Sequence, residues 1–296
     1  MNRSLSVWLS ASRPQTLPAA VIPVMAGASL ALAKGALQWN VTLVILICAL
    51  LIQIGTNFAN DYYDFIKGSD TEERIGFTRA TSAGLISPAA MLKAAWISMG
   101  LAFIAGLWLI WIGGWVILLI GLLSILFGFL YTGGPYPLGY NGLGDIFVFL
   151  FFGIIAVTGT YYLNTLEWSL LSLSVSLPVG ALSVNILVVN NLRDVEQDRK
   201  SGKRTLGVLL GDKALKVEYL MMQGVAFITP VLLLLFSQAG FSILLPLLLI
   251  PLALKLHKSV WNHTDKRLLN GTLEETARFM VFYGILFASG ILFSGL

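Results

Sequence analysis

The sequence predicts an all-α integral membrane protein whose chain crosses the bilayer nine times. Three observations predict this fold class: 57% of the 296 residues are hydrophobic, only 11% are charged, and the uncharged residues form long blocks. An average globular protein carries roughly 25% charged residues, so a soluble domain of this size could not cover its surface with the charges available. The composition therefore excludes a soluble enzyme, a nucleic-acid-binding protein and a disordered protein.

The uncharged blocks define the expected helices in order. Seven blocks contain no Asp, Glu, Lys or Arg: 14–33, 35–60, 94–144, 146–166, 168–192, 219–254 and 279–296. A helix needs about 20 apolar residues to cross the hydrocarbon core. Block 94–144 therefore has to hold two helices, and Gly113-Gly114 provides a natural turn between them. Block 219–254 is long for one crossing and short for two.

The distribution of charge decides how often block 219–254 crosses the membrane. With two crossings, 18 of the 19 basic residues lie on the cytoplasmic side and only Lys34 lies outside. With one crossing, the five basic residues from Lys255 to Arg278 would lie outside, against the positive-inside rule. We therefore expect nine helices, a cytoplasmic N-terminus and a single domain over residues 1–296. Of the 15 acidic residues, 14 fall on the cytoplasmic side, which indicates a functional polar face there.

Two of the expected helices end in similar groups of acidic and amide side chains. They are Asn57, Asn60, Asp61 and Asp64 beyond the second span, and Asn191, Asp194 and Asp198 beyond the sixth. If the helices continue past their apolar runs, this spacing places each group on one helical face. Carboxylates so close to one another repel, and they are costly near a bilayer unless they are paired or hydrated. Each group should therefore have a cationic partner.

A magnesium diphosphate would be such a partner, because Mg²⁺ commonly binds one or two carboxylates together with substrate phosphates. Seven nearby basic residues could complete the site, and arginine is suited to bidentate contacts with phosphate. They are Lys67, Arg74, Arg79, Arg193, Arg199, Lys203 and Arg204. One alternative is that both groups are solvated loops capped by Asn and Asp. Another is a secondary transporter, whose carboxylates bind coupling ions near the bilayer midplane.

At these residues the chain resembles the UbiA-type intramembrane prenyltransferases. Their signature is an Asn-Asp-x-x-Asp-x-x-x-Asp motif after the second helix and an Asp-x-x-x-Asp motif after the sixth. Asn60-Asp61-x-x-Asp64 and Asp194-x-x-x-Asp198 match, whereas position 68 is Gly and the next acid is Asp70. Four segments are similar to the branch that acts on 1,4-dihydroxy-2-naphthoate: Asn60 to Asp70, Asn191 to Thr205, Arg13-Pro14-x-Thr16 and Tyr131-Thr-Gly-Gly-Pro135.

The resemblance implies helices around a central cavity, with short cytoplasmic segments capping it and the active site facing the cytoplasm from the inner or plasma membrane. It implies an Mg²⁺-dependent transfer of a polyprenyl group from polyprenyl diphosphate to an aromatic acceptor, with the apolar tail reaching membrane lipid. For the naphthoate branch the product would be demethylmenaquinone, formed with loss of carbon dioxide and diphosphate in menaquinone or phylloquinone biosynthesis. The alternative acceptor is 4-hydroxybenzoate or a related aromatic compound.

The motif residues receive expected roles. The expected metal ligands are Asn60, Asp61, Asp64, Asp70, Asp194 and Asp198. The residues expected to bind substrate are Arg13, Asn57, Lys67, Arg79, Asn191, Arg193 and Lys203. The residues expected to take part in catalysis are Asp64, Asp194, Asp198, Arg79 and Tyr131.

Two of these roles have open alternatives. Arg13 would pair with the carboxylate of the acceptor, or would anchor the N-terminal segment at the membrane surface as a positive-inside residue. Tyr131, together with Tyr62 and Tyr136, would stabilise an allylic cation through the face of its ring. Each of these tyrosines could instead be an interfacial anchor.

Overall fold

The computed structural model describes residues 3–69 and 75–296, so Asp70, an expected metal ligand, lies outside the described residues. Within these ranges the chain forms helices and no strand, which confirms the all-α fold class. The helices are α1 Arg3–Ala11, η1 Pro14–Thr16, α2 Pro18–Ala33, α3 Trp39–Ile66, α4 Pro88–Leu130, η2 Leu138–Tyr140, α5 Gly144–Val148, η3 Phe149–Ile155, α6 Ala156–Thr165, α7 Leu170–Lys200, α8 Leu206–Leu210, α9 Asp212–Phe236, η4 Phe241–Leu249, α10 Ile250–Asn262, η5 Lys266–Leu268 and α11 Leu269–Phe293.

Seven described helical segments are long and apolar enough to cross a membrane. They are Trp39–Ile66, Pro88–Leu130, Gly144–Thr165, Leu170–Lys200, Asp212–Phe236, Phe241–Asn262 and Lys266–Phe293. The pair Leu5–Thr16 and Pro18–Ala33, bent by 53°, gives an eighth if it counts as one span. The protein is therefore an integral membrane protein, while the count of nine spans stays a prediction.

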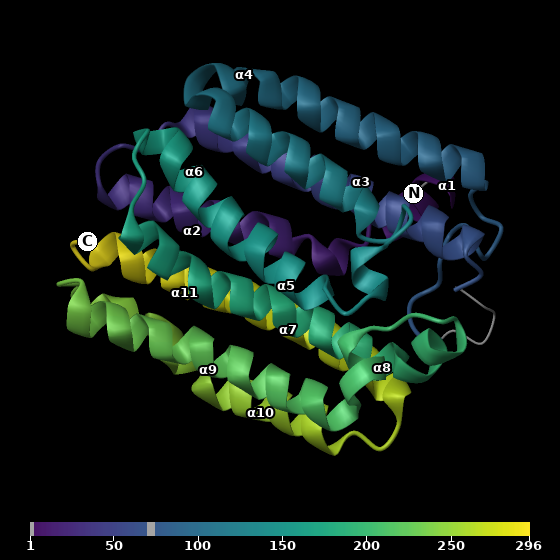
Figure 1. Ribbon diagram of the computed structural model, residues 1–296. Coiled ribbons are helices and arrows are strands. Elements are labelled where there is room, and N and C mark those ends of the chain that lie inside the picture. The colour runs from purple at the N-terminus through teal and green to yellow at the C-terminus, as the bar shows by residue number, and fades with distance from the viewer. Residues whose placement is uncertain (1–2, 70–74) are drawn as a thin grey trace.

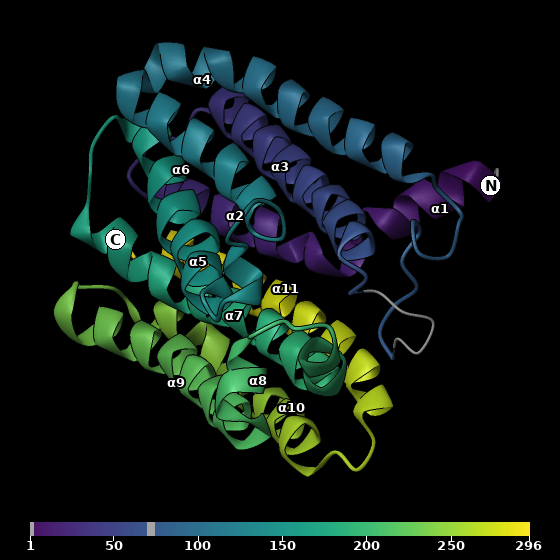
Figure 2. The same cartoon turned by 45° about the vertical axis from the view of Figure 1, so that its right-hand side comes forward.

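Helix α4 is folded back on itself at the expected glycine turn. Gly114 has φ 71° and ψ −160°, a conformation outside the helical region that glycine adopts without a Cβ penalty. Trp96 and Phe129, near opposite ends of α4, have ring centroids 4.3 Å apart, whereas a straight helix would separate them by about 50 Å. The two halves of α4 lie side by side in both views (Figures 1 and 2), so this element holds two antiparallel helices.

The last third of the chain forms three long helical segments. Block 219–254 holds two of them, α9 and the pair η4–α10, as the charge distribution predicts. The loop expected up to Arg278 is shorter than predicted, because α11 begins at Leu269. Its first turns tolerate charge because their side chains are exposed and paired: Arg278 lies 3.5 Å from Glu274, and Glu275 lies 3.7 Å from Lys255.

Helices α3 and α7 continue past their apolar runs, as their residue spacing predicts. Helix α3 ends at Ile66 and α7 at Lys200, so both acidic groups lie on the final helical turns. Helix α7 lies centrally in the bundle (Figure 1), and Gly180 lets it approach η3 closely, since a Cβ there would lie 3.1 Å from the Cα of Gly153. Small residues of this kind allow close helix packing in membranes.

Short segments cover the end of the bundle where α3 and α7 end. Helix α1, helix α8 and the loops that follow α3 and α4 gather there (Figure 2). Beneath them, the helices enclose a cavity of about 470 Å³. The structure thus has the central cavity and the cap over one end that the resemblance implies.

Candidate active site

The cavity has a polar end and an apolar end. Asp64, Asp194 and Asp198 line it under the cap, whereas Ile45 and Leu109 line it deeper in the bundle. Ile45 and Asp64 lie on the same helix, and 19 residues of helix span about 28 Å. The cavity can therefore take a molecule with an anionic head and a long apolar chain.

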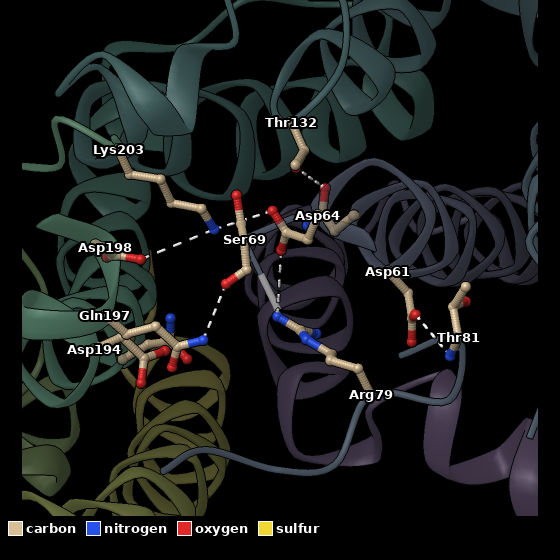
Figure 3. A network of polar contacts seen from close by, with 12 residues as sticks. Asp61, Asp64, Ser69, Arg79, Thr81, Thr132, Asp194, Gln197, Asp198 and Lys203 are labelled. Carbon is tan, nitrogen blue, oxygen red and sulfur yellow. Dashed lines mark hydrogen bonds and ion pairs between the residues drawn. The ribbon is translucent and has the colours of Figure 1, made fainter. Parts of the chain in front are cut away.

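The side chain of Asp64 contacts a tyrosine, a lysine and an arginine from three other segments of the chain. Its Oδ1 accepts hydrogen bonds from Tyr140 Oη at 2.6 Å and from Lys203 Nζ at 3.0 Å. Its Oδ2 lies 3.6 Å from Arg79 Nη2. Figure 3 shows Lys203 and Arg79 approaching this carboxylate from different segments. The cationic compensation expected for the first acidic group is therefore present.

Lys203 also joins the second acidic group to the first. Its Nζ lies 3.9 Å from Asp198 Oδ1, and the hydroxyl of Thr205 donates to Asp198 Oδ2 at 3.4 Å. Gln197 adds a second bridge, because its Nε2 donates to the backbone carbonyl of Ser69 at 3.0 Å. The acidic ends of α3 and α7 thus face one another across a single cavity.

Asp61 contacts the backbone of the loop that carries Arg79. Its two carboxylate oxygens accept hydrogen bonds from the backbone N–H groups of Ala80 and Thr81, each at 3.1 Å. The side chain is only 1% exposed. These bonds fix the backbone next to Arg79, and metal binding by Asp61 would have to compete with two backbone donors.

The guanidinium of Arg193 is held by hydrogen bonds to other side chains of the protein. Its Nε and Nη2 each lie 2.7 Å from a different oxygen of Asp194. Nη2 also donates to Asn190 at 2.7 Å, and Nη1 donates to Asn270 at 3.0 Å. Asn270 in turn donates to the carbonyl of Ile75. The predicted contact between Arg193 and diphosphate would therefore have to replace some of these four bonds.

Lys67 lies outside the residues that line the cavity. Its ammonium donates to the backbone carbonyl of Thr132 at 2.6 Å and lies over the ring of Tyr140. Burial lowers the pKa of Lys67, while Asp64 opposes that shift. The hydroxyl of Thr132 donates to Asn60 Oδ1, which fixes the amide of this expected metal ligand. Lys67 thus contacts residues around the site and does not line the cavity.

Arg13 lines the cavity in a left-handed backbone conformation with φ 53°. The hydroxyl of Thr16 donates to the Arg13 carbonyl at 2.9 Å and accepts from Gln53 and Asn57. Asn57 also donates to the carbonyl of Ser12 at 2.8 Å. The expected substrate ligand Asn57 therefore ties the turn that carries Arg13 to α3, and both residues lie at the cavity wall.

The remaining expected residues divide between the cavity and other places. Asn191 and Tyr131 line the cavity, whereas Tyr62 and Tyr136 do not. Tyr136 is 59% exposed. Burial raises the pKa of Tyr131 well above its usual range, and the nearby carboxylates of Asp145, Asp64 and Asp198 act in the same direction. Tyr131 therefore stays a neutral phenol at the cavity wall.

Sequence reasoning missed several residues of the polar network. Tyr140 contacts Asp64 directly, Thr132 bonds Asn60, and Asn270 bonds Arg193. Tyr140 and Thr132 lie in a loop, where no helical periodicity marks them. Asn270 lies 77 residues from Arg193. Only the position of Tyr140 shortly after the glycine-rich segment that follows Tyr131 could have drawn attention to it.

The oxygen donors of the two helix ends suit a hard divalent cation. Among the described residues, no three His, Cys, Asp or Glu side chains already converge as a metal site. However, one cation, the ammonium of Lys203, already lies within 3.9 Å of both Asp64 and Asp198. The carboxylates of α3 and α7 can therefore share a cation, and the donor set fits Mg²⁺.

Known proteins are similar to this chain in sequence and in fold. The sequence profile of the UbiA prenyltransferase family matches residues 20–287. The chain is 36% identical over 293 residues to the 1,4-dihydroxy-2-naphthoate octaprenyltransferase of Mycobacterium tuberculosis, covering 99% of each chain. It is 32% identical to the enzyme of the same name from Bacillus subtilis, covering 96% of this chain and 91% of that one. Among solved structures, a UbiA homolog from Archaeoglobus fulgidus bound to DMAPP and Mg²⁺ superposes with a TM-score of 0.69 at 15% identity, covering 95% and 98%.

Proposed function

The chain belongs to the UbiA prenyltransferase family, and we propose that it transfers a polyprenyl group from polyprenyl diphosphate to 1,4-dihydroxy-2-naphthoate. It is an integral membrane prenyltransferase. The observation that carries the proposal is the meeting of Asp64, Asp198 and Lys203 at the polar end of an otherwise apolar cavity. The full-length similarity to two relatives named for the naphthoate acceptor supports the choice of that substrate.

The diphosphate would bind at the polar end of the cavity. Asp64, Asp194 and Asp198 with Asn60 would hold Mg²⁺ together with Asp70, whereas Asp61 would act through the backbone of the loop that carries Arg79. When bound, Mg²⁺ would offset the charge that develops on the leaving diphosphate oxygens. Arg79 and Lys203 line the same end of the cavity, so both can bind diphosphate oxygens with charge-assisted hydrogen bonds.

The transfer needs no protein nucleophile. The bond from C1 of the prenyl chain to the diphosphate oxygen breaks, and its electron pair leaves on the oxygen. The naphthoate ring carbon that carries the carboxylate donates an electron pair to C1. Loss of that carboxylate as carbon dioxide returns an electron pair to the ring and restores its aromaticity, which gives the reduced form of demethylmenaquinone. The atoms and charges balance without a protein acid or base.

The chain's own residues would protect and orient the reacting groups. The apolar lining of the cavity would keep water away from the allylic cation, which water would otherwise capture. The ring of Tyr131 can stabilise that cation through its face. Arg13, whose carbonyl is held by Thr16 at the cavity wall, would pair with the acceptor carboxylate.

The placement in the membrane follows from the charge distribution. We propose nine spans, an N-terminus on the cytoplasmic side and an active site that faces the cytoplasm, in the inner or plasma membrane. In this arrangement 18 of the 19 basic residues are cytoplasmic. The soluble substrate and the released diphosphate would then exchange with the cytoplasm, and the prenyl chain would stay in lipid.

A comparison of acceptors tests the proposed reaction. The purified full-length protein is incubated with Mg²⁺ and geranylgeranyl diphosphate, and with 1,4-dihydroxy-2-naphthoate labelled in its carboxyl group. Parallel reactions contain 4-hydroxybenzoate, or 1,4-dihydroxynaphthalene as a matched acceptor without a carboxylate. We expect prenylated naphthalenediol and one labelled carbon dioxide per turnover with the first acceptor. Turnover of 4-hydroxybenzoate without turnover of the naphthoate would contradict the proposal.

A further inference from the structure

We propose that Tyr140 is a positioning residue that holds Lys203 and Asp64 in the arrangement needed to receive the diphosphate. This inference rests on the proposed prenyl transfer, because it concerns the same anionic substrate. Tyr140 lies in the loop between α4 and α5 and lines the cavity.

The hydroxyl of Tyr140 fixes the carboxylate of Asp64. It donates to Asp64 Oδ1 at 2.6 Å and lies 2.8 Å from the hydroxyl of Ser69. A tyrosine hydroxyl has one proton, and that proton is used on Asp64, so Ser69 donates to Tyr140. The resulting chain from Ser69 through Tyr140 to Asp64 leaves the carboxylate one preferred orientation.

The ring of Tyr140 holds two ammonium groups. Lys203 Nζ lies 4.5 Å from the ring centroid, and Lys67 Nζ lies 4.6 Å from it. The face of an aromatic ring attracts a cation without neutralising it. The ring therefore helps to hold the Lys203 ammonium in its place beside Asp64.

The backbone around Tyr140 connects the loop to the segment that follows α7 and to the end of α4. The carbonyl of Tyr140 accepts from the N–H of Arg204 at 2.7 Å, next to Lys203. The N–H of Gly139 donates to the carbonyl of Tyr131 at 2.9 Å. A Cβ at position 139 would lie 2.9 Å from Cε1 of Tyr131, so only glycine lets the loop approach so closely. Tyr140 is therefore fixed on both sides before substrate binds.

Lys67 gains a different role in this arrangement. It lies outside the cavity lining, and its ammonium contacts the carbonyl of Thr132 and the ring of Tyr140. Lys67 therefore acts on the diphosphate site through its contact with Tyr140. Tyr140 connects this outer lysine to the inner pair of Lys203 and Asp64.

The test distinguishes the contribution of the Tyr140 ring from that of its hydroxyl. It also distinguishes an effect on substrate binding from an effect on turnover. Tyr140→Phe keeps the ring and removes the bond to Asp64, whereas Tyr140→Leu removes both. Tyr136→Leu is the matched control, because Tyr136 belongs to the same loop, is 59% exposed and does not line the cavity. The affinity for geranyl S-thiolodiphosphate, an analogue that does not ionise readily, is measured by calorimetry in Mg²⁺, alongside kcat and the KM of each substrate.

We expect Tyr140→Leu to weaken analogue binding and raise the KM for prenyl diphosphate by about tenfold, with the KM for the aromatic acceptor within about twofold of wild type. We expect Tyr140→Phe to bind the analogue within about threefold of wild type, with kcat reduced by about fivefold or more because Asp64 loses its hydroxyl partner. Tyr136→Leu should match wild type in every measurement.

Unchanged analogue affinity in Tyr140→Leu would overturn the inference, as would an equal rise in both KM values. If Tyr140→Leu does not fold, an unchanged kcat in Tyr140→Phe would overturn it instead. The calorimetry requires no acceptor and no turnover. A wild-type protein that fails to bind the analogue would therefore count against the proposed function, whereas equal binding by wild type and Tyr140→Leu counts only against the role of Tyr140.

Discussion

The ammonium of Lys203 lies 3.0 Å from the carboxylate of Asp64, although 139 residues separate them in the sequence. The same ammonium lies 3.9 Å from Asp198. This contact offsets the repulsion between two acidic helix ends at the edge of a membrane bundle, where unpaired carboxylates are costly. A metal ion that binds between α3 and α7 has to take over this role from Lys203.

Replacing Lys203 should change metal and diphosphate binding in opposite directions. In Lys203→Met, we expect Mn²⁺ to bind about fivefold or more tightly without substrate, because Asp64 and Asp198 lose their competing cation. The KM for prenyl diphosphate should rise by about tenfold or more, because a charge-assisted contact is lost. Mn²⁺ titration by electron paramagnetic resonance and steady-state kinetics measure the two effects. Lys258→Met, an exposed lysine on α10, is the control, and unchanged Mn²⁺ affinity in Lys203→Met would contradict the account.

Asp61 should act through the protein backbone. Both of its oxygens accept backbone N–H groups from the loop that carries Arg79. We expect Asp61→Ala to lose about 1–3 kcal/mol of stability, because two buried donors lose their acceptor, and to raise the KM for prenyl diphosphate through Arg79. The Mg²⁺ concentration at half-maximal rate should stay within about twofold of wild type. A rise of more than about tenfold in that concentration would instead show that Asp61 binds the metal, as the sequence motif predicts.

Arg193 should be important for stability. Its guanidinium makes four hydrogen bonds to Asp194, Asn190 and Asn270, and it is 1% exposed. Arg193→Met removes both guanidinium bonds from the buried carboxylate of Asp194, and breaking such a buried pair costs about 3–5 kcal/mol. We expect a marked fall in the midpoint of thermal unfolding in detergent, and only partial recovery in Arg193→Lys, because lysine cannot form the bidentate pair. A wild-type midpoint in Arg193→Met would contradict this expectation.

Tyr131 should contribute to catalysis through its ring, and it should affect the pH dependence of stability only at high pH. Its pKa in the folded protein is raised above the ordinary value of 10.0 by burial. The unfolded chain therefore releases the phenol proton first as pH rises, so stability is complete below pH 10 and falls above it. Tyr131→Phe should reduce this alkaline loss and keep most activity with an unchanged rate profile between about pH 6 and 9, whereas Tyr131→Leu should lose about tenfold or more in kcat. Equal activities of Tyr131→Phe and Tyr131→Leu would show that the ring does not contribute to catalysis.

The nine-span topology predicts which positions a membrane-impermeant thiol reagent can reach. In a Cys48→Ser background, single cysteines replace Lys34, Glu167 and Lys213 in turn. We expect the first two to be labelled from outside intact cells, and the third only after the cells are opened, because basic residues gather on the cytoplasmic side. Labelling of the cysteine at position 213 in intact cells would contradict this topology.

Helix limits could be predicted from the sequence wherever charge or spacing constrained them. The turn at Gly114 followed from the length of one apolar block, and the helical continuation to Ile66 and Lys200 followed from the spacing of the acids. The start of α11 at Leu269 was missed, because exposed charged residues occur as readily on a helix end as in a loop.

Side-chain pairing in the site was harder to predict, because it joins segments far apart in the chain. The spacing of Asp61 and Asp64 gave both the same expected role, but one contacts backbone N–H groups and the other contacts Lys203. Likewise, Arg193 was expected to bind substrate, whereas Asn270 and Asp194 bind its guanidinium in the folded chain. Loop residues such as Tyr140 carry no periodic pattern, so only the folded chain reveals their contacts.

We propose that the acids of α3 and α7 act together as one metal–diphosphate site. A double-mutant cycle of Asp64→Asn and Asp198→Asn, measured as the Mg²⁺-dependent kcat/KM for prenyl diphosphate in protein with the wild-type helical content, tests it most directly. The account predicts a loss of about 1,000-fold or more in each single variant and little further loss in the double variant, because residues that act as a unit are not additive. Either single variant with more than about a tenth of wild-type activity, or two losses that simply multiply, would contradict it.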